Sequence, residues 1–201
     1  MTIRISILVA ISLGLFTGEA QAQSVLDKYL KKSTQGSAAE SGGAGDPSIN
    51  KVYEGKAGFW RLDDTRSSGG FCAVTYYASP YYAGYVGPVA GKPDAFILFS
   101  GPTIPPIKKG KNKKMTLTTA DGIAQTVPAF HAPNPEQKDS GLVIFKLTDI
   151  EAAMDEMSDT EHVRIGLGKE QVFSIKWEGG HTARAAMRQC LSGSAEPAGD
   201  E

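Results

Sequence analysis

Three histidines, His131, His162 and His181, are the side chains of this chain best suited to transfer protons near neutral pH or to bind a metal ion. Their spacing contains neither H-x-x-x-H nor H-E-x-x-H, and a zinc site needs three or four converging ligands. Asp121, His131 and Ser140 are the residue types of a hydrolase triad, but spacing in a sequence does not establish triad geometry, and the chain has no G-x-S-x-G motif. We therefore assign no catalytic residue, metal or cofactor, and we interpret these side chains as surface loop residues.

Five lysines within seven residues make the most concentrated charge in the chain: Lys108, Lys109, Lys111, Lys113 and Lys114. They lie between a Pro-rich turn and a strand predicted from Met115 onward, so we expect them on a hairpin loop. Such a loop could attract anionic envelope polymers, such as cell-wall or lipid phosphates. The alternative is a solvated loop whose lysines discourage edge-to-edge aggregation.

A cluster of tyrosines is the second candidate binding feature: Tyr76, Tyr77, Tyr81, Tyr82 and Tyr85. Tyrosine combines a flat apolar face with a hydroxyl group, which suits the binding of sugars or peptides. Residue 76 or 77 should point inward with its strand. Residues 79–88 contain Pro80 and Gly84 and are interpreted as a loop, so we expect Tyr81, Tyr82 and Tyr85 to be exposed; the alternative is that the cluster belongs to the core.

The first 22 residues have the three parts of a secretory signal peptide. Arg4 supplies positive charge, residues 5–16 are mostly apolar, and Ala20-Gln21-Ala22 offers a cleavage site before Gln23. We therefore expect a periplasmic or secreted protein. In an oxidising compartment the two cysteines of the chain, Cys72 and Cys190, most simply form one disulfide; the alternative is two buried free thiols.

The remaining composition divides the chain and limits its partners. Residues 24–32 could form a short helix with Val25, Leu26 and Tyr29 on one side, and residues 33–48 are rich in Gly, Ser and Ala. We therefore expect a short helix and flexible linker over 23–48, a β-rich domain over 49–192 and a disordered tail over 193–201. Deleting residues 24–48 should then cost little stability. The net charge of −1 argues against a nucleic-acid partner, and no segment after the leader has the length and hydropathy of a membrane span.

Runs of β-branched and aromatic residues, separated by Gly, Pro, Asn and Asp, predict a mainly β domain with antiparallel strands. The predicted strands span residues 57–62, 71–77, 95–100, 115–119, 126–131, 142–147, 163–167 and 173–177. Pro128 favours an edge position for its strand, because proline cannot donate a ladder hydrogen bond. We expect a β-sandwich or a strongly curved sheet, with two short helices over one end or edge.

The two predicted helices span residues 149–158 and 182–191. Thr148 and Glu151 fit a capping box for the first helix. The second helix has an apolar stripe that carries Cys190 toward the core, where Cys72 on its strand can meet it.

The order of these features resembles a known family. Trp60 on an early strand is followed by the Cys72 strand, then by an apolar strand that leads into a Pro-rich turn (96–106), and finally by a helix, two strands and a closing helix (150–191). This layout is similar to that of the invasion-associated locus B proteins of Gram-negative bacteria. The chain lacks the further cysteines that we associate with that family. The resemblance implies a β-rich periplasmic or secreted protein and supplies no catalytic residue.

The sequence thus favours a non-enzymatic binding protein of the cell envelope, acting on an envelope component or on an external protein. Two alternatives stay open. One is an envelope hydrolase with a dispersed site, which a deep pocket with converging polar groups would favour. The other is a structural accessory protein that docks through its N-terminal helix, which an apolar surface matching Val25, Leu26 and Tyr29 would favour.

Overall fold

A computed structural model describes residues 50–68, 70–88, 95–135 and 137–193 of the chain. The expected leader, the short helix at 24–32, the linker and residues 194–201 of the expected tail lie outside the described residues. The predictions about them therefore stay predictions.

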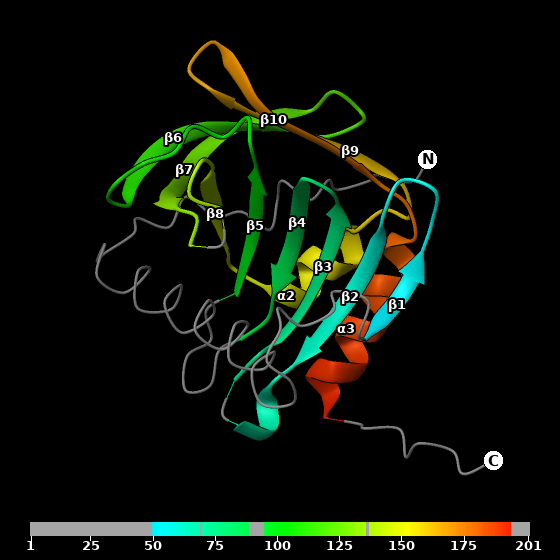
Figure 1. Cartoon of the computed structure of the whole chain (residues 1–201). Helices are drawn as coiled ribbons and strands as arrows, with labels where there is room; N and C mark the ends of the chain where they lie inside the picture. The colour runs from blue at the N-terminus through cyan, green and yellow to red at the C-terminus, as the bar shows by residue number, and fades with distance from the viewer. Residues whose placement is uncertain (1–49, 69, 89–94, 136, 194–201) are drawn as a thin grey trace, which may run out of the picture.

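The described part of the chain confirms a mainly β fold with two short α-helices (Figure 1). Ten strands form one antiparallel sheet in the order β1-β2-β3-β4-β5-β8-β7-β6-β9-β10. The strands are β1 (Lys51–Glu54), β2 (Phe59–Asp64), β3 (Cys72–Ala78), β4 (Tyr81–Val86), β5 (Ala95–Gly101), β6 (Lys111–Thr118), β7 (Ala124–Pro133), β8 (Gly141–Leu147), β9 (Glu161–Leu167) and β10 (Glu170–Trp177). Between β2 and β3 lies a short 3-10 turn, η2 (Arg66–Ser68).

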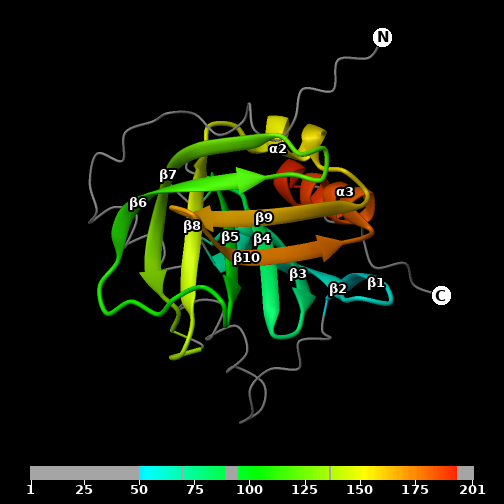
Figure 2. The same cartoon turned by 90° about the horizontal axis from the view of Figure 1, so that it is seen from above.

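The sheet curves so strongly that one part of it packs on another. In Figure 2, β9 and β10 run across β3, β4 and β5 rather than alongside them. Side chains bridge the two parts: the ring of Phe173 on β10 meets Phe99 of β5 at 5.4 Å and Tyr81 of β4 at 5.8 Å between centroids, both edge to face. The expected curvature is therefore present, within one continuous sheet.

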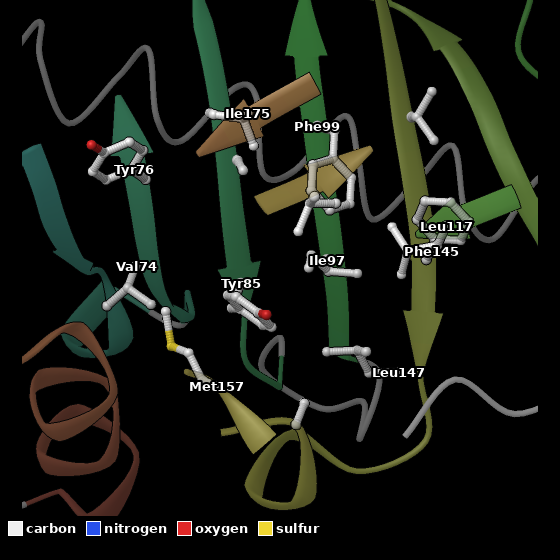
Figure 3. Close-up of a cluster of buried hydrophobic side chains, with 14 of the residues drawn as sticks. Val74, Tyr76, Tyr85, Ile97, Phe99, Leu117, Phe145, Leu147, Met157 and Ile175 are labelled. Atoms are coloured by element: carbon white, nitrogen blue, oxygen red, sulfur yellow. The ribbon is translucent and has the colours of Figure 1, made fainter. Parts of the chain in front are cut away.

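The inner side of this curve holds the main core (Figure 3). Because successive side chains of a strand point to opposite faces, Ile97 and Phe99 of β5 point inward together, and Phe145 lies opposite Ile97 on β8. Trp60 is fully buried, and its Nε1–H donates to the carbonyl oxygen of Glu178 at 2.8 Å. The aromatic and aliphatic runs that predicted the strands are thus the residues that fill the core.

Two helices close this inner side. They are α2 (Ile150–Glu156) and α3 (Gly180–Ser192), and Arg188 of α3 bonds to Glu151 and Asp155 of α2. The predicted capping box was wrong by one residue: the N-cap of α2 is Asp149, whose carboxylate accepts hydrogen bonds from the N–H groups of residues 151 and 152. The carboxylate of Asp149, one residue closer to the helix, acts as the N-cap in place of the hydroxyl of Thr148.

Cys72 and Cys190 form the predicted disulfide, with their Cα atoms 6.0 Å apart. It ties β3 to α3 across 118 residues of sequence. Ala183, Met187 and Cys190 are buried on one side of α3, as the apolar stripe predicted. In the chain-entropy account, a loop of this length stabilises the fold by about 3–5 kcal/mol.

The strand that contains Pro128 differs from its prediction. β7 is not an edge strand, because it lies between β6 and β8. Pro128 itself pairs with Lys114 of β6, however, while the pairing with β8 starts only at Phe130. Proline lacks a backbone N–H, and it is tolerated at position 128 because β8 does not pair with β7 at that position.

Candidate anion-binding surface

The lysine run lies at the start of β6 as well as in the loop before it. The expectation of a hairpin loop over 108–114 was therefore wrong for its second half, since β6 begins at Lys111. There, Lys111 pairs with His131, Lys113 with Ala129 and Lys114 with Pro128. Lysine has a low strand propensity, so the local sequence did not indicate a strand that pairing with β7 imposes.

The regular register of β6 divides the lysines between its two faces. Lys111 and Lys113 point to the side of Met115 and Leu117, which are core residues, and Lys114 points to the opposite side. Lys108 and Lys109 precede the strand. We call the five residues Lys108, Lys109, Lys111, Lys113 and Lys114 the lysine surface, with Lys111 and Lys113 as its inward-facing pair.

One side of this half of β6 is open. β9 pairs with β6 only at residues 116–118, so the described chain provides no strand neighbour for residues 111–114 on that side. An open strand edge that carries lysines is protected against pairing with another chain. Four of the five lysines are exposed, which leaves their charged groups accessible to a ligand.

The loop before β6 is held in place by close packing. Residues 107–111 line an open depression of about 380 Å³. At Gly110 a β-carbon would lie only 2.3 Å from Cζ of Phe130, which is fully buried. Only glycine fits this contact, and the loop backbone is therefore fixed against the core.

No ion pair within the described residues neutralises the charges of the lysine surface. Lys113 is half-buried and the other four are exposed. Among the described residues, none of the five forms an ion pair, whereas Lys51, for example, pairs with Glu54 at 3.0 Å. Clustered, unpaired cations raise the local positive potential even in a chain whose net charge is −1.

His131 lies directly beneath this surface. It is 4 % exposed, and its Nε2 lies 2.9 Å from the carbonyl oxygen of Pro105. Burial lowers the pKa of His131, the nearby Lys111 and Lys113 lower it further, and the bond to Pro105 opposes them. A neutral imidazole that donates its Nε2–H to the carbonyl oxygen of Pro105 fits this environment. The contact between His131 and Pro105 helps to hold the loop before β6 in place.

Of the three residues considered as a triad, Asp121 lies apart from His131, whereas Ser140 is next to Gly141, where a β-carbon would lie 2.7 Å from Nε2 of His131. Asp121 is in the turn between β6 and β7, where it accepts a hydrogen bond from the hydroxyl of Thr119 at 2.6 Å. His131 lies seven residues after Ala124, the first residue of β7. Seven strand residues span about 23 Å, so His131 lies far along the strand from the turn that contains Asp121. Ser140 precedes β8, and its hydroxyl accepts a bond from Asn134 at 3.0 Å. The geometry does not assemble a triad from these residues.

The surface-loop interpretation of the histidines was wrong for two of the three. His131 lies in β7 and is buried because β7 pairs on both sides there. His162 lies in β9 and its Nε2 is 2.9 Å from the hydroxyl of Ser174. His181 is exposed in the first turn of α3.

The predicted tyrosine loop is a strand, β4, so the expected exposure of Tyr81, Tyr82 and Tyr85 was wrong. β4 pairs with β3 and with β5, which buries it from both sides. Tyr85 is 1 % exposed, Tyr82 is 9 % exposed and Tyr81 is half-buried against Phe173. Gly84 indicated a loop, but in the sheet it makes room for a close neighbour, since a β-carbon there would lie 2.8 Å from the hydroxyl oxygen of Thr75.

The sulfur atoms of Cys72 and Cys190 lie near a carboxylate oxygen of Asp64, the one grouping of potential metal ligands in the described residues. The two sulfurs are bonded to each other and do not provide thiolate ligands. The three residues are therefore grouped because the disulfide lies beside Asp64, and the bonded sulfurs are not available as metal ligands.

No helix of the described residues has the length and hydropathy needed to cross a membrane. The chain matches no known protein-family model, and neither a curated protein nor a solved structure is significantly similar to it. The resemblance to the invasion-associated locus B proteins therefore stays a hypothesis.

Proposed function

We propose that this protein is a non-enzymatic, periplasmic or secreted protein that binds an anionic polymer of the cell envelope through its lysine surface. The observation that carries the proposal is a set of five lysines without ion-pair partners in the described chain, on a fixed loop and an open strand edge. Such a set interacts with repeated phosphate or carboxylate groups at several points at once. The disulfide is compatible with a compartment outside the cytosol.

The proposal predicts that binding needs several lysines and weakens with salt. Replacing Lys109, Lys111 and Lys113 by Gln should abolish the sedimentation of the protein with anionic phospholipid vesicles or cell-wall fragments at low ionic strength. Lys109 and Lys111 are exposed and Lys113 is half-buried, and surface substitutions of this kind rarely alter stability by more than about 0.5 kcal/mol, so the fold should persist.

A matched control removes the same total charge elsewhere. Lys56, Lys138 and Lys169 are exposed residues outside the lysine surface. Their replacement by Gln should leave vesicle binding within about twofold of wild type if position matters more than net charge. Equal loss in both triple variants, or equal retention in the first variant and wild type, would refute the proposal.

A further inference from the structure

The sheet has a second apolar face, on the side opposite to α2 and α3. Its residues form rows across five strands, because each faces its neighbour in the pairing register. One row runs Tyr77, Tyr82, Ser100, Leu142, Ala132; the next runs Thr75, Gly84, Leu98, Ile144, Phe130; and the third runs Ala73, Val86, Phe96, Lys146. We call this the outer face; Figure 1 views the sheet from this side.

The outer face is buried although it belongs to no described second layer. Ten side chains form a cluster there, each 9 % exposed or less: Phe71, Ala73, Tyr82, Val86, Phe96, Leu98, Phe130, Ala132, Leu142 and Ile144. The residues of α2, α3, β9 and β10 that join a core cluster all belong to the inner one. A sheet with apolar residues on both faces needs a covering layer on each, and the described chain supplies only one.

A buried polar group marks the same face. Thr75 lies in the middle row, is 1 % exposed, and its hydroxyl has no hydrogen-bond partner among the described residues. Such a group normally finds a partner when it is shielded from water. Its burial is thus a second sign that the outer face is covered.

We propose that the outer face is the docking site of residues 24–32 of the same chain. This segment, SVLDKYLKK, precedes the described chain and has apolar residues at Val25, Leu26, Tyr29 and Leu30. In a helix these four share one side, while Asp27 and Lys31 point the opposite way. The segment thus has the amphipathic pattern of a covering element and remains in the chain after the expected cleavage before Gln23.

The length of the connecting chain permits this docking. Residues 33–49 span up to about 56 Å when extended. The described chain starts at Asn50, next to β1, and β5 lies four strand spacings from β1, which is about 19 Å. The linker therefore reaches the centre of the outer face with slack. The connection between β4 and β5, residues 87–94, is in contrast too short to cover five strands.

Docking changes an expectation drawn from the sequence. A free helix and linker would be dispensable for stability. A helix that buries Leu98 and Ile144 would instead contribute, since removing aliphatic side chains from water stabilises the folded state. The deletion of residues 24–48 should therefore lower the unfolding midpoint and expose an apolar patch.

Site-specific photo-crosslinking in the processed chain, residues 23–201, tests the docking. A benzophenone amino acid replaces Tyr29 in one variant and Lys31 in a control variant, and crosslinked peptides are identified by mass spectrometry. We expect monomeric products that join position 29 to peptides containing Tyr82, Leu98 or Ile144, in at least fivefold higher yield than from position 31. Equal yields, no such product, or products only between two copies would overturn the proposal.

A second pair of variants tests whether the segment covers the face. Leu26→Asp with Tyr29→Asp should raise the fluorescence of a dye that binds apolar surface, while Lys28→Asp with Lys31→Asp should not. Near-ultraviolet circular dichroism checks that the sheet domain remains folded in both variants. Unchanged dye fluorescence in the first variant would show that another element covers the outer face, and it would contradict the proposal.

Discussion

At the scale of single residues, the region around His131 shows how the loop before β6 is fixed. His131 contacts Pro105 from below, and Gly110 rests on the ring of Phe130. The sequence pattern predicts neither contact, because Gly110 between lysines is equally typical of a turn. The candidate lysines were found from their spacing, but the residues that position them were not, because contacts between distant strands determine those positions.

Gly110→Ala tests the close packing of the loop. The new β-carbon would meet the buried ring of Phe130, so we expect a loss of about 1–3 kcal/mol in the free energy of unfolding. Gly166→Ala is the control, since its β-carbon would have no neighbour closer than 3.6 Å. Denaturant unfolding of the two variants measures the difference, and equal stabilities would show that the loop adjusts freely.

The lowered pKa of His131 predicts a pH dependence. Burial lowers the pKa of His131 in the folded state, so the folded chain keeps the imidazole neutral to a lower pH than the unfolded chain, which takes up a proton at about pH 6.5. Stability contributed by the neutral form is thus complete above that pH and is lost as the pH falls toward the folded pKa. His131→Gln should reduce the decline in unfolding free energy between about pH 7.5 and pH 5. An unchanged decline would assign the pH dependence to other groups, such as His162, whose pKa is also lowered.

At the scale of elements, a strand was predicted correctly where its own residues favour a strand, and it was missed where pairing with neighbouring strands decides. β5 and β8 are continuous apolar runs, and their predicted bounds differ from the observed ones by one residue at most. β4 was missed because Pro80 and Gly84 resemble loop residues, although β3 and β5 pair with it on both sides. The first half of β6 was missed because its lysines disfavour a strand until β7 supplies a partner.

The disulfide is the strongest link between elements that the sequence predicted. Replacing both Cys72 and Cys190 by Ser should lower the free energy of unfolding by about 3–5 kcal/mol, since it frees a long loop in the unfolded chain. Thermal or denaturant unfolding of the variant and of the wild type measures this. Wild type treated with reductant serves as a control and should approach the variant, and a variant as stable as the oxidised protein would contradict the assigned role.

At the scale of the whole molecule, one sheet serves three purposes on three of its parts. Its inner face forms the main core with α2 and α3, its outer face offers a second apolar layer, and the open edge of β6 presents the lysine surface. The pattern of β-branched and aromatic residues predicted a β-rich fold, and the spacing of the five lysines identified the candidate binding surface. A strongly curved sheet was expected, but the order in which its strands pair and the burial of its outer face depend on contacts between distant strands, which spacing along the chain does not reveal.

Backbone amide NMR during titration with a soluble polyphosphate tests the central claim most directly. At low ionic strength we predict chemical-shift changes concentrated at residues 107–114, with little change around Lys56, Lys138 and Lys169. Raising the salt from about 0.02 M to about 0.5 M should reverse them, because the Debye length then falls from about 20 Å to about 4 Å. Shifts that are absent, or spread evenly over all exposed lysines, would contradict the assignment of an anion-binding surface to this part of the molecule.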